Sequence, residues 1–480
     1  MLIVLLLLIP LLGGLLTMFT TEKVAGPIAM LAGLATLGIA IATYIQYTNG
    51  YDLMVNHSWI EYLGARFTVG FDHGDGLAIL MMMLTAIVFP LIFISLINKQ
   101  PERQNTFYGL MLFAQVGLMG VFLAKDALLF YVFWEIALIP VYFLSSMYGG
   151  PRRIPVTFKF FIYTFAGSLI MLVAILLIYR HAPIRSFSWD SFVSVGSAMN
   201  AGEQSWLFWM MFIAFAIKMP VFPFHTWQPA AYEQSATPVT VVLSAIMVKM
   251  GLFAVIRWLL PVIPAGSLQW MNLVILLSVI SIVYASCMAI VQTNIKRMIA
   301  YSSIAHIGLM SAAIFSHQLL GLQGVAIQMF NHGITIAGLW MMVHIIENRL
   351  GTQDLREMGG VAKVAPAFTI GLVVMSLANI ALPLTNGFIG EFMMFNGLFK
   401  TASVYHVWFT VVAGLGIILA AVYTLNMIQK VAYGPEGSRV PSFADLKINE
   451  MIVMVLIVMM ILVLGFYPKI MMDLIYVQPW

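Results

Sequence analysis

The amino-acid sequence predicts an all-α polytopic membrane protein with about fourteen transmembrane helices in a single membrane domain, residues 1–480. Composition is the first observation behind this prediction, because 62% of the residues are hydrophobic and only 9% are charged. No soluble core could hide so much apolar surface behind so few charges. The second observation is a series of apolar stretches long enough to cross a bilayer, and the third is the interruption of two of them.

The apolar stretches define the individual spans, since a helix needs about 20 apolar residues to cross the hydrocarbon core. We expect spans at residues 2–19, 25–46, 77–97, 107–124, 127–148, 157–180, 206–223, 235–260, 269–292, 297–315, 320–346, 367–400, 406–430 and 449–475. The first run has no basic segment before it and leads directly into a second span. We therefore interpret it as a retained helix and not as a cleaved signal peptide.

The seventh and twelfth spans are predicted to be broken. In the seventh, Pro220 and Pro223 follow Lys218, and proline removes a helix hydrogen bond and clashes with the preceding turn. In the twelfth, Pro383 interrupts the apolar run shortly before Glu391. Non-helical backbone at membrane depth is tolerated only where protein buries it or where it lines a wet cavity.

The two interruptions lie five spans apart, and this spacing predicts an internal repeat. Spans 4–8 (residues 107–260) and spans 9–13 (residues 269–430) would form two five-helix units, the second inverted because five is an odd number of crossings. Corresponding discontinuous helices in two halves indicate a transport site. Residues 1–106 would add spans 1–3 and residues 449–475 the last span.

Loop charges predict the orientation of the chain. With the N-terminus outside, fourteen Lys and Arg residues fall on the inner side and six on the outer side. This distribution follows the positive-inside rule and places both termini outside. The net charge of +4 is small and scattered, so nucleic acid, which needs a clustered basic face, is excluded as a partner. The membrane-spanning surface of the chain is expected to contact lipid.

Four ionisable residues fall inside predicted spans, where a charge costs at least about 2.5–3.5 kcal/mol to insert. They are Glu135 in LLFYVFWEIALIPVYF, Lys218 in FWMMFIAFAIKMPVF, Lys249 in TPVTVVLSAIMVKMGLFAVI and Glu391 in FIGEFMMF. Ionisable groups at that depth indicate an ion or proton path by default. The sequence therefore favours a transport function.

Each of the four residues also has a purely structural interpretation. Glu135 and Lys218 could form a buried ion pair without a role in transport. Lys249 could extend its long side chain to a lipid headgroup. Glu391 could cap the helix that follows the break in span twelve. The positions of the four side chains in the fold distinguish these interpretations from a path.

Three histidines are weaker candidates for proton transfer. His306 and His332 fall inside apolar spans, and a neutral imidazole can pass a proton between its two nitrogens. His225 follows the break of span seven at the cytoplasmic side, where it could admit protons. Each of them could equally be a hydrogen-bonded core residue.

Metal and redox chemistry within this chain are not expected. The three histidines lie on different spans, and no histidines or acids have the close spacing of metal ligands. The single cysteine, Cys287, excludes an internal disulfide and an iron–sulfur cluster held by this chain alone. No GxxxxGK[ST] motif for phosphate binding occurs.

Four separated motifs carry a family resemblance: FWEIALIPVYFL, AIKMPVFPFHTWQPAAYEQSATPVTVVLSAIMVKMGLF, NIKRMIAYSSIAHIGLM and LTNGFIGEFMMF. Over about residues 75–430 the chain resembles the antiporter-like membrane subunits of respiratory complex I, the NADH–quinone oxidoreductase, and within them the M-type subunits, called subunit 4 in mitochondria. Glu391 stands where the L and N subunits and the cation/proton antiporter subunits carry lysine. The chain also stops without the long lateral helix of the L subunit.

The resemblance implies a proton-translocating role for the four ionisable residues. Glu135 would pair with Lys218, Lys249 would be the central proton carrier, and Glu391 the terminal group. The family places the histidines of spans ten and eleven, here 306 and 332, as links between Lys249 and Glu391.

The resemblance also implies partners and a location. Neighbouring L and N subunits would flank the chain in a bacterial inner membrane. NADH, FMN, iron–sulfur clusters and quinone would bind to partner subunits, with no cofactor in this chain. Alternative assignments are a subunit of a cation/proton antiporter, a subunit of a membrane-bound hydrogenase and, least favoured, a structural scaffold.

One segment departs from the family pattern. After His-Thr-Trp the family commonly reads Leu-Pro-Asp-Ala-His, whereas this chain has Gln228, Pro229, Ala230, Ala231 and Tyr232. The acid and the second histidine are missing, although Glu233 follows directly. The route by which protons enter span seven is therefore left open by the sequence.

Overall fold

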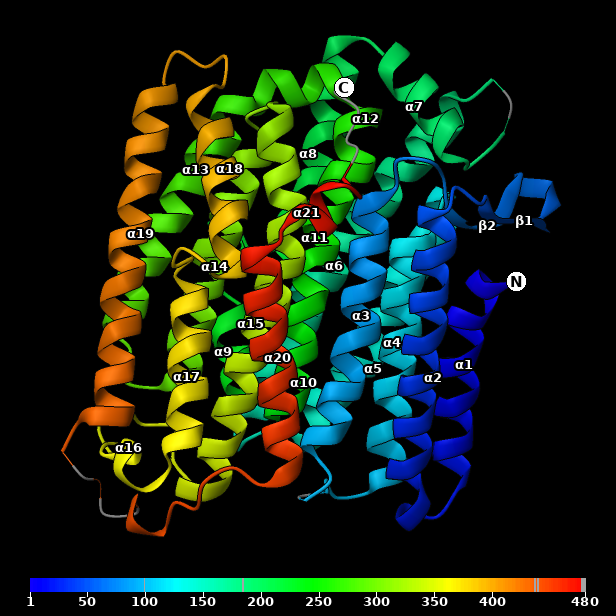
Figure 1. The fold of residues 1–480 in the computed structure, drawn as a ribbon. Coiled ribbons are helices and arrows are strands. Elements are labelled where there is room, and N and C mark those ends of the chain that lie inside the picture. Colours follow the sequence, from blue (N-terminus) through cyan, green and yellow to red (C-terminus); the bar gives the residue numbers. More distant parts are fainter. Residues whose placement is uncertain (99, 184, 436, 438–439, 476–480) are drawn as a thin grey trace.

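The computed structural model describes residues 1–98, 100–183, 185–435, 437 and 440–475. Two inner-side cations used for the predicted orientation, Lys99 and Arg439, lie outside the described residues. Long helices run along one common direction, with α1 at one end of the bundle and α19 at the other (Figure 1). Short connections close the bundle at both ends, as expected for a polytopic helical protein.

The N-terminal part packs three helices beside a small hairpin. Its elements are α1 (Leu2–Phe19), α2 (Glu22–Thr48), β1 (Leu53–Ile60), β2 (Ala65–Phe71) and α3 (Gly76–Ser95), with the 3-10 turn η1 (Glu61–Leu63) inside the hairpin.

The central part contains the first broken helix. Its elements are α4 (Gln104–Leu123), α5 (Ala127–Tyr148), α6 (Arg153–His181), α7 (Trp189–Ala198), α8 (Ala201–Lys218), α9 (Gln228–Gln234), α10 (Thr237–Val242), η2 (Leu243–Met247), α11 (Val248–Ala254), η3 (Val255–Leu259) and α12 (Leu260–Val262). The segments from α10 to α12 form one continuous helical path in which η2 and η3 are π-helical.

The C-terminal part contains the second broken helix. Its elements are α13 (Pro264–Ile290), α14 (Ile295–Ile314), α15 (Leu319–Leu350), α16 (Val361–Val364), α17 (Pro366–Asn379), α18 (Asn386–Phe399), α19 (His406–Ile428), η4 (Gln429–Tyr433), η5 (Val440–Ser442), α20 (Ile448–Phe466) and α21 (Lys469–Met472).

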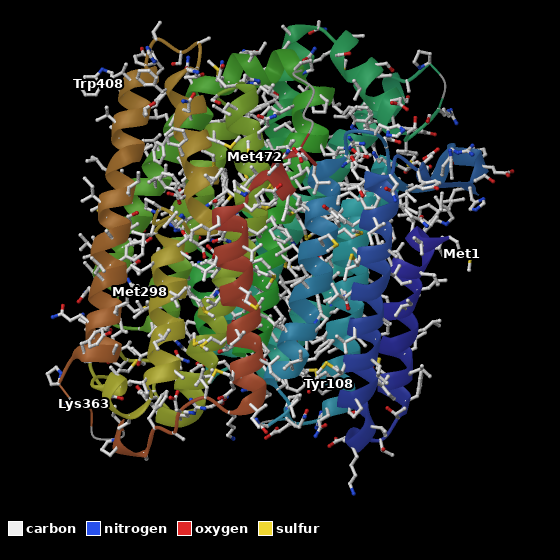
Figure 2. The ribbon with its side chains drawn as sticks, in the orientation of Figure 1. Met1, Tyr108, Met298, Lys363, Trp408 and Met472 are labelled. Carbon is white, nitrogen blue, oxygen red and sulfur yellow. The ribbon has the colours of Figure 1, made fainter. Side chains whose placement is uncertain are left out.

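The prediction of a multi-pass membrane protein is confirmed. Within the described residues, 11 helices are long and apolar enough to cross a membrane. Apolar side chains project outward along the bundle, and Trp408 and Lys363 lie at its opposite ends (Figure 2). Helices α8, α14, α17 and α18 are not among the 11. Of these, α17 and α18 have 14 residues each because the predicted twelfth span is interrupted.

Both predicted breaks are present. In span seven, α8 ends at Lys218 and α9 begins at Gln228. The indole Nε1 of Trp227 donates to the carbonyl of Ile217 at 2.9 Å, which satisfies an acceptor that the interrupted helix leaves without a partner. In span twelve the connection uses left-handed backbone at Ala381 and Leu384, with φ of 55° and 74°.

Residues 53–71 depart from the all-helical prediction, because they form an antiparallel hairpin. Leu53 pairs with Phe71 and Ile60 with Ala65. Strand β2 is buried from Thr68 to Phe71 against the rest of the chain. No strands were predicted from the sequence in the connection between the second and third spans. The strands pack onto neighbouring helices, and such tertiary contacts strongly influence strand formation.

The crossing of α4 over α5 provides a test of the helix packing. We expect Gly117→Ala to destabilise the protein by about 1–3 kcal/mol, because a Cβ on Gly117 would lie 2.3 Å from the backbone nitrogen of Ala137. Gly38→Ala on α2 is the matched control, since no atom lies within 4 Å of its added Cβ. The thermal midpoint of each purified variant in detergent measures the effect. Equal midpoints for both variants would contradict the close helix crossing.

Candidate functional site

A buried row of four ionisable side chains connects four helices in the interior. The Nζ of Lys249 on α11 lies 2.9 Å from Nδ1 of His332 on α15. The ring of His332 lies 5.3 Å, centroid to centroid, from that of His306 on α14. Nδ1 of His306 lies 3.1 Å from Oε1 of Glu391 on α18. The structure thus places the two histidines between Lys249 and Glu391, as the resemblance implied.

Lys249 is positioned by the irregular helix that carries it. Its side chain is 0% exposed, and besides His332 it donates to the carbonyl of Ser244 at 2.7 Å. Ser244 belongs to the π-helical segment η2, and π-bulges occur frequently at functional sites. Because the amine bonds to interior groups, Lys249 does not extend to a lipid headgroup, and the snorkelling interpretation is wrong.

Glu391 lies beyond the cap of its helix. The N-cap of α18 is Thr385, and the Glu391 carboxylate bonds instead to His306, so the capping interpretation is also wrong. The start of α18 is clamped to α15 by reciprocal bonds: Asn331 Nδ2 donates to the carbonyl of Asn386 at 2.6 Å, and Asn386 Nδ2 donates to the carbonyl of Asn331 at 3.2 Å. This clamp holds Glu391 beside α14 and α15.

Glu135 and Lys218 are neighbours but not a contact pair. Their opposite charges are close enough to attract each other, yet within the described residues no ion pair of 4 Å or less joins them. Lys218 Nζ lies instead 5.3 Å from the centroid of the Trp134 ring, within cation–π range. Lys218 also occupies the last turn of α8, where the helix dipole favours a cation.

His225 does not join the row. It is buried after the break of span seven and packs between Phe222 and Tyr284, with ring centroids 5.8 Å and 5.1 Å away. Its Nδ1 has no hydrogen-bond partner among the described residues. The loop that carries His225 packs against Tyr284 on α13, and a role of His225 in admitting protons stays a prediction.

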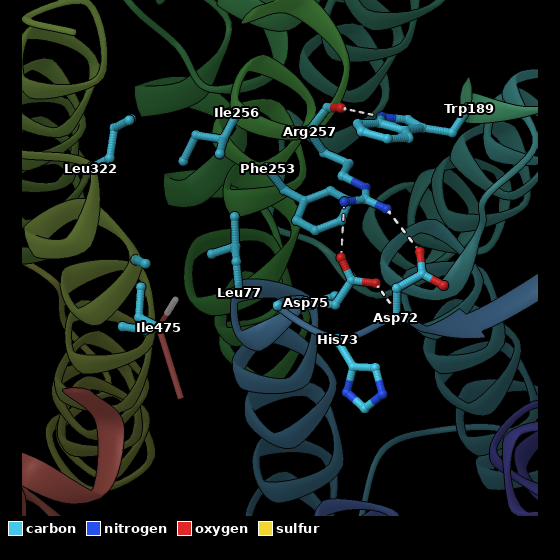
Figure 3. A pocket seen from close by; sticks show the side chains of 13 residues that line it. Asp72, His73, Asp75, Leu77, Trp189, Phe253, Ile256, Arg257, Leu322 and Ile475 are labelled. Atoms are coloured by element: carbon cyan, nitrogen blue, oxygen red, sulfur yellow. Dashed lines mark hydrogen bonds and ion pairs between the residues drawn. The ribbon is translucent and has the colours of Figure 1, made fainter. Parts of the chain in front are cut away.

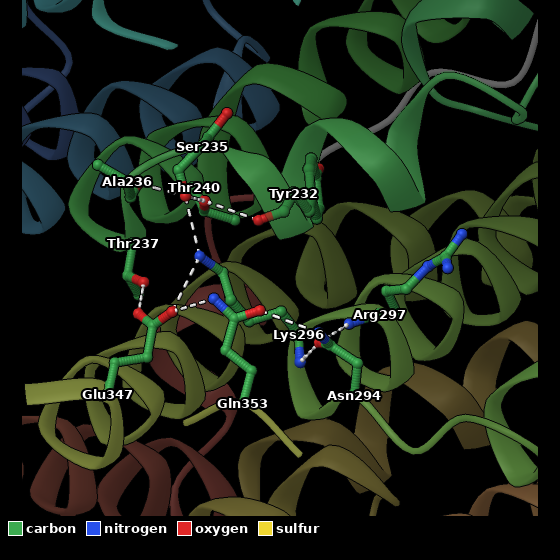
Figure 4. A network of polar contacts seen from close by, with 10 residues as sticks. All are labelled: Tyr232, Ser235, Ala236, Thr237, Thr240, Asn294, Lys296, Arg297, Glu347 and Gln353. Carbon is green, nitrogen blue, oxygen red and sulfur yellow. Dashed lines mark hydrogen bonds and ion pairs between the residues drawn. The ribbon is translucent and has the colours of Figure 1, made fainter. Parts of the chain in front are cut away.

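A polar network where α9 and α10 meet the start of α14 and the end of α15 was not anticipated from the sequence (Figure 4). Lys296 at the start of α14 donates to the carbonyl of Ser235 at 2.9 Å and lies 3.4 Å from Glu347 near the end of α15. Thr237 donates to the same carboxylate. Sequence inspection counted Lys296 only as an inner-loop cation, and no local pattern signals its pairing with a residue fifty positions away.

A second charged network lines a cavity of about 600 Å³ beside the start of α3 and the start of α7 (Figure 3). Arg257 Nη1 lies 2.8 Å from Asp75, and Lys125 contacts both Asp75 and Asp72. Burial and the nearby Arg257 charge lower the pKa of the Lys125 ammonium, and the two aspartates partly offset this effect. Phe253, four residues after Lys249 on α11, also lines the cavity.

The site has no metal-binding constellation in the part of the chain that the structure describes, since no three His, Cys, Asp or Glu side chains converge there. What the arrangement can do chemically is exchange protons, because amine, imidazole and carboxylate groups each gain and lose a proton. Fold and site together define a multi-pass membrane protein with a connected row of proton-exchanging groups through its interior.

Comparison with known proteins identifies the family. The sequence profile of the transmembrane NADH:quinone oxidoreductase/Mrp antiporter proteins matches residues 124–426. NADH-quinone oxidoreductase subunit M of Rickettsia prowazekii is 36% identical over 93% of this chain and 90% of the relative. F(420)H(2) dehydrogenase subunit M of Methanosarcina mazei is 32% identical over 98% and 95%.

A solved structure agrees with the sequence comparisons. A chain of respiratory complex I from Thermus thermophilus with bound NADH superposes with a TM-score of 0.89 at 26% identity, covering 99% of this chain and 100% of that chain. The protein therefore belongs to the NADH:quinone oxidoreductase/Mrp antiporter family of membrane subunits, and the resemblance stated from its motifs is confirmed.

Proposed function

We propose that this chain is the M-type, proton-translocating subunit of an NADH–quinone oxidoreductase. The observation that carries the proposal is the buried row from Lys249 through His332 and His306 to Glu391. Burying four ionisable groups in an apolar bundle is costly, and a proton path explains why they are consecutive neighbours. The names of the most similar relatives support the choice of enzyme complex.

A change in charge at Glu135 starts the transfer. The Glu135 carboxylate stabilises the nearby Lys218 ammonium, because an opposite charge favours the ionised form. When Glu135 is neutralised or displaced, Lys218 releases its proton toward Lys249. The proton then passes along the two histidines to Glu391, which delivers it to the outside or to a neighbouring subunit.

The proposal includes the finer architecture predicted from the sequence. The chain would cross a bacterial inner membrane fourteen times with both termini outside. Residues 107–260 and 269–430 would be inverted repeats, flanked by residues 1–106 and 449–475. Support comes from the matching interruptions, α8–α9 in one unit and α17–α18 in the other.

Neighbouring subunits are expected at both flanks of the bundle. Ile139 and Phe143 on α5 are exposed one to two turns after Glu135, and Trp408 and Ile418 are exposed on α19. We propose that the L and N subunits cover these apolar faces together with lipid.

Partner subunits also supply the free energy for pumping. Moving a proton against 100 mV costs about 2.3 kcal/mol. We propose that this free energy comes from the oxidation of NADH and the reduction of quinone, through FMN and iron–sulfur clusters in partner subunits.

A second candidate differs in the electron donor. The relative named as an F(420)H(2) dehydrogenase subunit is similar over nearly the whole chain, so the same membrane subunit could serve a complex that oxidises reduced F420. An ion-gradient-driven antiporter is the other candidate, because the family profile includes Mrp antiporters.

Purification of the tagged chain from its native membranes in mild detergent tests these assignments. We expect co-purifying flavin and iron, with NADH-driven quinone reduction that is absent from a mock preparation of untagged cells. Quinone reduction with reduced F420 but not with NADH would support the second candidate. Membrane partners without redox centres, together with cation/proton exchange in vesicles, would support the antiporter and overturn the proposal.

A further inference from the structure

We propose that the Tyr232 hydroxyl carries the proton between Lys218 and Lys249, positioned by the side chains of Gln228 and Ser244. The inference rests on the proposed proton-translocating function and names the group that performs one of its steps. It concerns the segment in which this chain departs from the family pattern, where an acid and a histidine are missing.

The three side chains form a fully buried polar cluster. Each is 0% exposed, and the Tyr232 hydroxyl interacts with the Gln228 amide and with the Ser244 hydroxyl. Within the described residues, however, neither hydroxyl and neither atom of the amide completes a well-formed hydrogen bond. Buried polar groups without full hydrogen bonding are costly and rare, so a cluster of them in an apolar bundle indicates a function beyond packing.

The cluster joins the helix that follows the break after Lys218 to the helical segment that leads into Lys249. Gln228 and Tyr232 are four residues apart on α9 and therefore share a face, and α9 is the helix that resumes after the break behind Lys218. At the other side, Ser244 is the residue whose carbonyl accepts the hydrogen bond from Lys249 Nζ. Ser244 therefore belongs to the cluster through its hydroxyl and contacts Lys249 through its backbone carbonyl.

The lysines themselves are close in the fold but do not touch. A Cβ added to Gly251, two residues after Lys249, would lie 2.8 Å from the backbone nitrogen of Met219, the residue after Lys218. Among the described residues no hydrogen bond joins the two amines; Lys218 Nζ has no hydrogen-bond partner there. A group between them is needed to pass a proton.

A tyrosine hydroxyl can perform this step without a net chemical change. Its oxygen accepts a proton that originates from the Lys218 ammonium, while its own O–H proton leaves toward the Lys249 amine, with water filling the remaining gaps. One O–H bond forms as another breaks, and rotation about the C–O bond then restores the starting orientation. The Gln228 amide is a positioning group, because an amide holds the hydroxyl by hydrogen bonds but does not exchange protons readily at neutral pH.

The simplest alternative is that Tyr232 serves only as a packed ring. Its ring lies 5.8 Å from that of Trp340 and 6.5 Å from that of Trp227, centroid to centroid. Tyr232→Phe keeps these contacts and removes only the hydroxyl. Tyr232→His removes the hydroxyl but supplies an imidazole, which can also pass a proton.

The test measures NADH-driven proton pumping per quinone reduced, with the complete complex in sealed membrane vesicles. We expect Tyr232→Phe to lower pumping at least about tenfold and Tyr232→His to restore most of it, with unchanged thermal midpoints. The matched control is Tyr108→Phe, because Tyr108 is also a buried tyrosine. Its hydroxyl donates to Gln100 at 2.6 Å near the start of α4, away from the cluster. Pumping by Tyr108→Phe should equal that of the wild type.

Three outcomes would overturn the inference or its premise. In the first outcome, Tyr232→Phe pumps as well as Tyr108→Phe, while Glu135→Gln loses pumping. This result would reject the role of Tyr232 and leave the proposed function intact. Loss of pumping in both Tyr232 variants with lowered thermal midpoints would assign a structural role to the ring. Normal pumping in both Tyr232→Phe and Glu135→Gln would reject the proposed function itself.

Discussion

Replacing Lys249 by methionine should lower NADH-driven proton pumping at least about a hundredfold, since a proton-transferring side chain contributes typically about 10²–10⁴-fold. The Lys249 amine makes both contacts at the start of the row: it donates to the Ser244 carbonyl and lies within hydrogen-bond distance of His332 Nδ1. Methionine fills a similar volume but cannot hold a proton. The amplitude of acidification in vesicles containing the intact complex, normalised to quinone reduction, measures the loss.

Folding should not limit the Lys249→Met variant. Lys249 has no ion-pair partner among the described residues, removing a buried charge relieves its desolvation cost, and methionine adapts to irregular core spaces. Lys23→Met is the matched control, because Lys23 is exposed at the start of α2 and should leave both pumping and the thermal midpoint unchanged. Wild-type pumping by Lys249→Met would remove Lys249 from the path and leave its burial unexplained.

Replacing Glu135 by glutamine should reduce coupled pumping at least about tenfold. Glutamine keeps the shape of the side chain but removes the negative charge that alternately stabilises and releases the Lys218 proton. Among the described residues Glu135 is the carboxylate that acts on the Lys218 charge, so no second carboxylate replaces the lost charge. Pumping per quinone reduced is again the measurement.

Two further variants separate the charge of Glu135 from its shape. Glu135→Asp retains a carboxylate on a shorter stem and should keep a substantial part of the pumping. Glu22→Gln at the exposed start of α2 removes a carboxylate outside the path and should behave as wild type. Near-normal pumping by Glu135→Gln would show that the proximity of Glu135 to Lys218 serves the structure of the protein and not proton transfer.

Much of the site followed from residue type and depth alone. A lysine or glutamate inside an apolar span has few explanations, so Lys249 and Glu391 were recognisable without knowledge of the fold. The two breaks followed from proline chemistry, and both occur where expected. The roles of His306 and His332 were implied by the family resemblance, and the structure adds that they lie between Lys249 and Glu391.

Other features depended on contacts between distant segments. The hairpin at 53–71 is formed by packing against helices. The packing of Lys218 over the Trp134 ring joins α8 to α5. The pairing of Lys296 with Glu347 joins two helix ends that are neighbours only in the folded chain.

Residue composition and the positions of prolines and charges were enough to predict that this protein spans a membrane, that two of its helices are interrupted, and that four ionisable groups lie in its apolar spans. These properties depend on local hydropathy and backbone chemistry, which each residue carries independently of the fold. The folded structure was needed to show which of those groups touch, that His225 lies outside the row, and that Tyr232 lies beside Ser244. Contact depends on how helices distant in sequence pack together, and short-range periodicity does not specify that packing.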